Sequence, residues 1–143
     1  MAVAKMSVAE LEEFLRREFP QAFGPGSLIT IERADGKTCR VRERFGERML
    51  RPGGTVSGPT LMALADCAMY VVLLSAIGPV GLAVTVNLNI NFLRKGSPGQ
   101  DVVAEARLLK LGRRLAVGEV TLMSADSADP IAHVTTTYSI PNT

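Results

Sequence analysis

The feature of this sequence most suggestive of chemistry is a single carboxylate, Asp66, inside an otherwise apolar run at residues 61–74. An aspartate within an apolar helix costs several kcal/mol unless it is paired, hydrogen-bonded or protonated. Helix propensity does not explain it, because Asp favours helix starts and this residue would lie about two turns in. We interpret Asp66 as a general base or nucleophile in a buried pocket of low dielectric constant. The alternative is a structural aspartate, satisfied by a hydroxyl group or an arginine at a subunit interface.

A glycine-rich segment, residues 53–59 (GGTVSGP), leads into this apolar run. Glycine lets the backbone approach a ligand closely, and N–H groups at the start of a helix stabilise a developing oxyanion. Gly58 is the expected donor, because Pro59 has no N–H. The alternative is an ordinary flexible turn followed by a helix cap. Since Gly58 and Asp66 lie on one predicted helix, together they indicate a catalytic site more strongly than either does alone.

Side chains near these two residues could take part in the same site. Tyr70 lies one helical turn after Asp66, so its hydroxyl could reach the carboxylate or line a pocket, with core packing as the alternative. Thr85 shares one face of the next predicted strand with three amide side chains, Asn87, Asn89 and Asn91. This face could form hydrogen bonds across a seam between paired strands or lie against water.

The remaining reactive residue types have no partners at a useful spacing. His133 is the only histidine and lies in a predicted strand, where we expect a packed residue rather than a base. Cys39 and Cys67 form no CxxC pair and have no neighbouring histidine, so we expect reduced core cysteines rather than nucleophiles. No metal site is predicted.

Composition points to an ordinary globular chain. Its 143 residues fit one domain, residues 1–143, with 47% hydrophobic and 21% charged residues. A net charge of +2 is too small to indicate nucleic acid or a membrane surface as a partner. The apolar run at residues 61–77 contains Asp66 and is shorter than the ~20 residues that cross a bilayer. Residues 1–5 show no signal-peptide core, so we expect a cytoplasmic protein.

The elements that would position these residues begin with a helix, a hairpin and a second helix. Ser7 and Glu10 form a capping box that starts an amphipathic helix at about residues 7–19. A hairpin signal follows at residues 34–37. The central helix spans about residues 58–77 and is apolar on every side, so other structure must enclose it.

Long strands fill the rest of the sequence. Residues 84–92 alternate apolar and polar side chains, and three further strands are predicted at 102–111, 115–124 and 131–140. A curled antiparallel sheet packed around one buried helix satisfies both patterns, which predicts an α+β fold.

Three segments together resemble the phenylacetate-degradation (PaaI-like) branch of the hotdog-fold acyl-CoA thioesterases. They are residues 57–66 (SGPTLMALAD), 84–94 (VTVNLNINFLR) and 112–114 (GRR). The resemblance covers roughly residues 50–140 in the right element order. It implies the hotdog fold, a curled antiparallel β-sheet wrapped around one long central helix, with the helix at about 7–19 as an addition.

The resemblance also implies roles for individual residues. Asp66 matches the family's helix acid, which activates water or attacks the thioester carbonyl, and the Gly58 amide matches its oxyanion donor. Thr85 matches a strand hydroxyl that helps to place the attacking water and that would come from the partner subunit. Ser57 stands where the family usually has His. Arg51, where Asn or Gln is often found, cannot accept a hydrogen bond, but it could clamp an acidic acyl group or neutralise Asp66.

The implied substrate is an acyl-CoA, with coenzyme A as part of the substrate and no metal or redox cofactor. We expect this substrate to contact Arg51, Ser57, Tyr70, Asn89, Arg94 and Arg113. The basic strand ends at Arg94 and Arg113 could bind the phosphates of coenzyme A, or could be ordinary solvated charges. We expect a homodimer or homotetramer, because pairing would cover the strand at residues 83–93.

Three other functions fit parts of this pattern. A hotdog hydratase or dehydratase normally uses a histidine with its acid, and His133 is poorly placed for that. An acyl-CoA-binding protein without turnover would keep the pocket and the arginines. A purely structural oligomer would leave Asp66 paired and without a catalytic role.

Overall fold

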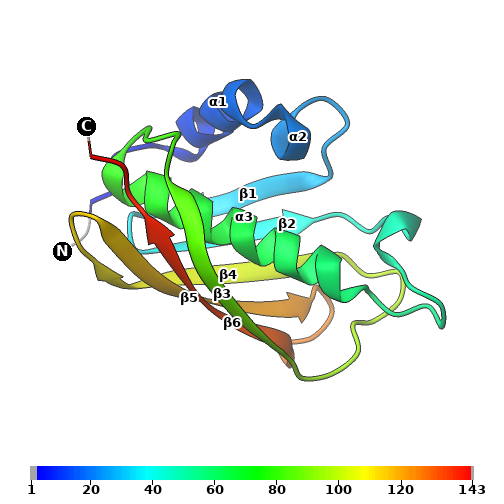
Figure 1. Ribbon diagram of the computed structural model, residues 1–143. Coiled ribbons are helices and arrows are strands. Elements are labelled where there is room, and N and C mark those ends of the chain that lie inside the picture. Colours follow the sequence, from blue (N-terminus) through cyan, green and yellow to red (C-terminus); the bar gives the residue numbers. More distant parts are fainter. Residues whose placement is uncertain (1–2, 143) are drawn as a thin grey trace.

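The computed structural model describes residues 3–142, which form one antiparallel sheet and the helices that lie on its inner face (Figure 1). The strands within these residues lie in the order β1-β2-β4-β5-β6-β3. The elements in chain order are α1 (Val8–Glu18), α2 (Pro20–Phe23), β1 (Ile29–Ala34), β2 (Thr38–Glu43), the 3₁₀ helix η1 (Glu47–Met49), α3 (Gly58–Ile77), β3 (Val84–Phe92), β4 (Val102–Leu111), β5 (Leu115–Ser124) and β6 (Pro130–Ser139). The curled sheet around α3 confirms the predicted hotdog fold.

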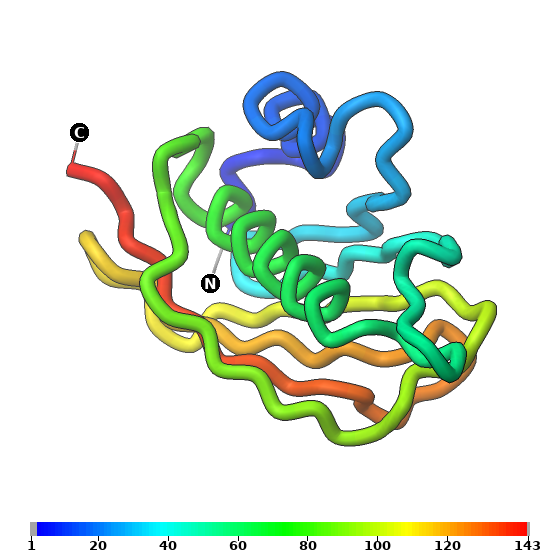
Figure 2. Tube along the Cα trace, turned by 45° about the vertical axis from the view of Figure 1, so that its right-hand side comes forward, coloured from blue at the N-terminus to red at the C-terminus, as the bar shows by residue number. Residues whose placement is uncertain are grey.

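Helix α1 forms where the capping box predicts it. The Glu10 N–H donates to the Ser7 hydroxyl at 3.1 Å, and the Ser7 N–H donates back to the Glu10 carboxylate at 2.9 Å. The buried face of this helix consists of Leu11, Phe14 and Leu15. Figure 2 shows α1 and α2 beside α3 and over β1, on the far side of α3 from β3. The additional helix therefore covers one side of the central helix and leaves the β3 side uncovered.

Helix α3 is the centre of the core. Twelve of its 20 residues are buried, and strands of the sheet surround it. Ser57 is the N-cap, and the helix ends at Gly78, whose positive φ of 95° favours glycine. The helix is long and apolar enough to cross a membrane, but 67% of its most apolar window is buried within the protein. It therefore has the surroundings of a core helix.

Strand β3 is one edge of the sheet and carries a bulge. Among the strands of residues 3–142 it pairs with β6 alone. Thr85 lies opposite Tyr138 and Asn87 opposite Thr137, so Val86 is the extra residue. The bulge reverses the alternation. Thr85 faces α3, whereas Asn87 and the asparagines after it lie on the outer face. The sequence prediction that Thr85 shares a face with Asn87, Asn89 and Asn91 is therefore wrong, because strict alternation does not continue through a bulge.

Several apolar side chains of the β3 segment are exposed in the single chain. Val84 and Val86 are 58% and 60% exposed, and Leu82, Phe92 and Leu93 are at least half exposed. Soluble proteins usually cover a long apolar edge strand or protect it with charges. The exposed apolar side chains of β3 are therefore typical of an edge that is covered by another subunit.

Candidate active site

Asp66 lies on the side of α3 that faces β3 and β6. The Thr85 hydroxyl donates to Asp66 Oδ1 at 2.6 Å, and the Tyr138 hydroxyl donates to the same oxygen at 2.8 Å. Within residues 3–142, no hydrogen bond or ion pair reaches Asp66 Oδ2. The carboxylate is half-buried rather than buried as the sequence suggested, because the edge strand β3 leaves this side of α3 partly open. One oxygen is thus fixed, and the other is available to a ligand.

Tyr138 is the residue of this site that the sequence analysis missed. Burial, followed by the negative charge of Asp66, raises the pKa of the Tyr138 phenol, so the hydroxyl remains protonated and acts as a donor. Its ring stacks on Tyr70, with centroids 6.0 Å apart and planes 21° apart. Tyr70 does not reach Asp66, because its own hydroxyl donates to the Gly81 carbonyl at 2.8 Å. Tyr70 therefore packs behind Tyr138 and lines the adjacent cavity.

Thr85 contacts Asp66 of its own chain. The family resemblance implied a hydroxyl supplied by the partner subunit, and the 2.6 Å bond within one chain corrects that expectation. The bulge at Val86 is the physical reason, because it turns Thr85 toward α3 while the rest of β3 keeps the opposite alternation.

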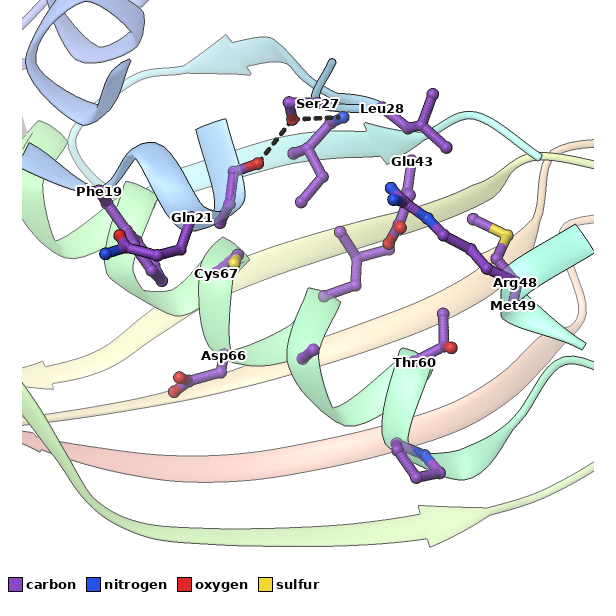
Figure 3. Close-up of a pocket in the computed structure, with 15 residues that line it drawn as sticks. Phe19, Gln21, Ser27, Leu28, Glu43, Arg48, Met49, Thr60, Asp66 and Cys67 are labelled. Atoms are coloured by element: carbon purple, nitrogen blue, oxygen red, sulfur yellow. Dashed lines mark hydrogen bonds between the residues drawn. The ribbon is translucent and has the colours of Figure 1, made fainter. Parts of the chain in front are cut away.

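Two cavities meet at Asp66. The first, of about 550 Å³, lies between α3, the β1–β2 hairpin, α2 and η1, with Asp66 at its edge (Figure 3). The second, of about 470 Å³, is lined by Tyr70, Tyr138 and Thr85. Cys67 lines the first cavity, but burial raises the pKa of its thiol to about 12, so it is not a thiolate nucleophile near neutral pH.

Gly58 is the first residue of α3. The Ser57 hydroxyl caps the helix by accepting the Thr60 N–H at 3.3 Å, so Ser57 has a local partner. Within the described residues, the Gly58 N–H has no acceptor. Gly58 lines a third cavity, of about 440 Å³, together with Arg51 and Arg94. The N-terminal end of α3, where the helix dipole is positive, therefore lies beside a groove that carries arginines.

The predicted residues thus form separate groups. Asp66, Thr85 and Tyr70 meet near the middle of α3, whereas Gly58, Ser57, Arg51 and Arg94 lie at its N-terminal end. Asn89 is exposed on the outer face and donates to Asn87 at 2.7 Å. Arg113 lines a cavity with Ile77, at the other end of α3. A single chain does not bring these groups to one point.

Other titratable groups lie away from the site. His133 is half-exposed on the outer face of β6, with its Nε2 atom 3.9 Å from Glu119. Among residues 3–142, no group of three or more His, Cys, Asp and Glu side chains is arranged to hold a metal ion.

Comparison with known proteins gives consistent results. The family model described as Thioesterase superfamily matches residues 53–131. A crystal structure of a candidate thioesterase from Silicibacter sp. TM1040 is 42% identical, with 97% of this chain and 94% of that chain covered and a TM-score of 0.88. No curated protein matches the sequence.

Two more distant structures share the fold. A Streptococcus mutans protein bound to acetyl CoA is 22% identical, with 80% of this chain and 89% of that chain covered and a TM-score of 0.70. The E. coli PaaI protein, from the phenylacetic acid degradation operon, is 21% identical, with 80% of each chain covered and a TM-score of 0.68. At these identities the likeness extends to the fold, and assignment to the PaaI-like branch stays a prediction.

Proposed function

The chain belongs to the thioesterase superfamily, and we propose that this thioester hydrolase acts on acyl-CoA, with Asp66 as the catalytic carboxylate. The observation that carries the proposal is the Asp66 carboxylate itself. Two hydroxyl donors hold Oδ1, while Oδ2 has no partner within residues 3–142 and lies where two cavities meet. The acetyl CoA bound to the similar Streptococcus mutans protein supports the ligand class.

In the proposed reaction, Asp66 acts as general base through Oδ2. It takes a proton from a water molecule while the water oxygen attacks the thioester carbonyl carbon. The Gly58 N–H donates to the oxyanion of the tetrahedral intermediate. The carbon–sulfur bond then breaks, coenzyme A leaves as a thiol with the proton from Asp66, and the free acid remains. Direct attack by Oδ2, followed by hydrolysis of the resulting anhydride, is the nucleophilic alternative.

The proposal requires two copies of the chain. Gly58 and Asp66 are eight residues apart on one helix, which separates them by ~12 Å along its axis. A general base and an oxyanion donor both lie about 3 Å from the atoms on which they act. Asp66 of one copy and Gly58 of a second would therefore share one thioester. The exposed apolar edge of β3 supports a homodimer, alone or within a tetramer.

The arginines would bind the polar parts of the substrate. Arg51 and Arg94 line the groove of Gly58, where they could hold the phosphates of coenzyme A or, for Arg51, an acidic acyl group. Arg113, at the other end of α3, would join such a site only through the second copy.

A mixing experiment tests the proposal. Asp66→Asn keeps the shape of the side chain and removes the base, and kcat on the best acyl-CoA should fall by at least ~10²-fold. Gly58→Pro removes the amide N–H at a position that suits proline, and Ser57, with φ −71° and ψ 149°, has a conformation suited to the residue before proline. Gly58→Ala is the matched control, because it adds the same Cβ against Phe92 and keeps the N–H.

Mixing the two inactive variants decides how the site is assembled. If subunits pair at random, half of the dimers contain one chain of each kind, and each of these has one intact site. Activity should then return to about one quarter of wild type. A mixture that exchanges subunits but stays inactive contradicts the shared site. A wild-type protein that binds acyl-CoA without hydrolysing it would instead be the binding protein considered above.

A further inference from the structure

A second carboxylate, Glu43, lines the same cavity as Asp66. Glu43 ends β2, where Cys39 and Val41 are the preceding inward-facing and buried residues. Its neighbours across the sheet are Ile29 and Val102. Figure 3 shows Glu43 and Arg48 on one side of the cavity and Asp66 on the other. A charged side chain thus occupies a position where the alternation of β2 calls for an apolar one.

Glu43 has no partner that explains this position. Within residues 3–142, no hydrogen bond or ion pair within 4 Å reaches its carboxylate. Burial raises the pKa of the Glu43 carboxyl, and the positive charge of Arg48 opposes that effect. The exposed Arg48 side chain lines the same cavity. The two groups therefore offer one hydrogen-bond acceptor and one set of donors to a ligand inside it.

The remaining wall of the cavity suits a hydrocarbon chain. Its apolar lining includes Leu28, Ile29, Met49, Ala63 and Leu64, alongside the polar Gln21, Ser27 and Thr60. Its volume of about 550 Å³ falls in the range of pockets that enclose drug-sized ligands, which is more than an acetyl group needs. An acyl group whose carbonyl lies at Asp66 could extend along this wall toward Glu43.

We infer that this cavity holds the acyl group and that Glu43, with Arg48, selects acyl groups bearing a hydroxyl several atoms from the thioester. The inference rests on the proposed function. A hydroxyl can donate to Glu43 and accept from Arg48 at the same time. A terminal carboxylate would pair with Arg48 but be repelled by Glu43, and a terminal amine would pair with Glu43 but be repelled by Arg48, whereas a neutral hydroxyl is repelled by neither. A plain alkyl end would leave the carboxylate without a partner and without water.

Matched pairs of substrates test this inference. Acyl-CoAs with four, six and eight carbons, plain and terminally hydroxylated, are compared by kcat/KM. At one chain length the hydroxylated substrate should be favoured roughly tenfold or more, as expected for a hydrogen bond to a charged group. Glu43→Leu should reverse this preference. Glu47→Leu, on the exposed η1 beside Arg48, is the control and should keep the wild-type preference.

The outcome separates this inference from the proposed function. Equal kcat/KM for plain and hydroxylated substrates at every length, or the same ratio in Glu43→Leu, overturns the role of Glu43 even if hydrolysis is efficient. If the protein hydrolyses no acyl-CoA, the proposed function fails, and calorimetry with non-hydrolysable thioether analogues tests Glu43 independently. Tighter binding of the hydroxylated analogue, lost in Glu43→Leu, supports the inference. Equal binding of both analogues overturns it.

Discussion

On the outer face of β1, β2 and β4, the acidic side chains Glu32, Glu105 and Asp101 lie against arginines. Arg40 and Arg42 each approach Glu32 to 2.7 Å, and they continue to Glu105 at 2.7 Å and Asp101 at 3.0 Å. On the inner side, neither Asp66 nor Glu43 forms an ion pair within 4 Å among the described residues, although Arg48 lines the same cavity as Glu43. Asp66 accepts two hydroxyl groups, and Glu43 accepts none.

This difference separates charges that support the fold from charges available to a ligand. The outer carboxylates are about one-third exposed, so each ion pair contributes little individually, although the network joins three strands. The inner carboxylates lie where apolar side chains would stabilise the protein more. Charged residues at positions where the surrounding structure favours apolar ones are expected at functional sites.

After removal of the Asp66 carboxylate itself, the largest effect is expected from the hydroxyl groups that donate to it. Thr85→Val and Tyr138→Phe each remove one donor from Oδ1 and should lower kcat about tenfold, with KM changed less than twofold, because orientation of the base is lost. Stopped assays on the best acyl-CoA measure both constants. Thr136→Val is the control, since its buried hydroxyl donates instead to the Asn87 carbonyl at 2.8 Å. An equal loss of kcat in that variant would contradict a positioning role.

A smaller effect is expected on stability at Glu43. The pKa of Glu43 is higher in the folded protein than in the unfolded chain, so the folded state favours the protonated carboxyl. The stability that protonation gives is fully present below the unfolded pKa of about 4.5 and is lost as pH rises through the folded pKa. At pH 7, Glu43→Gln should therefore raise the free energy of unfolding by about 1 kcal/mol. Near pH 4 the gain should disappear. Urea unfolding at both pH values measures it, and a less stable variant at pH 7 would show that the charge has a structural partner.

The smallest effect is expected on the outer face. The Arg42 guanidinium lowers the pKa of Glu32, and the Phe45 N–H together with Arg42 lowers that of Asp101. The ionised carboxylates of Glu32 and Asp101 therefore stabilise the folded protein above their unfolded pKa values. This stabilisation is lost as pH falls through their lower folded pKa values. Arg42→Gln should cost about 0.5 kcal/mol at pH 7, less at pH 3, and should leave kcat unchanged. A clear loss of kcat would mean that the outer network also shapes the site.

Local patterns were enough to predict much of the fold. The capping box at Ser7 and the apolar run after Gly58 predicted both long helices to within about one residue of the observed bounds. Asp66 was identified because a charge inside an apolar helix is visible without knowledge of the fold. The Gly-Pro pair at the start of the apolar run predicted a helix from about residue 58, and Gly58 is the first helical residue, with no acceptor for its N–H within residues 3–142.

The residues that were missed depend on contacts between distant segments. Tyr138 reaches Asp66 only because β6 lies beside β3, and neither strand indicates that pairing by its own pattern. Glu43 looks like an ordinary strand-end charge until β2 is known to direct it inward. Thr85 was identified, but it was assigned to the wrong subunit and the wrong strand face, because the bulge has no marker such as glycine.

The extra residue at Val86 also determines how this strand can be aligned and redesigned. Before Val86, odd-numbered Thr85 faces the helix, and after it the even-numbered Leu88 and Ile90 are the partly buried side chains packed on the core. Deleting Val86 would remove the bulge and leave Thr85 opposite Tyr138, still facing the helix and now in strict alternation with Asn87. Flattening the bulge with Val86 retained would instead turn Thr85 outward, because it would then have the same parity as Asn87. A sequence alignment with a relative that lacks the bulge must therefore open its one-residue gap at Val86, because an ungapped alignment would place Val86 at the helix-facing position that Thr85 occupies.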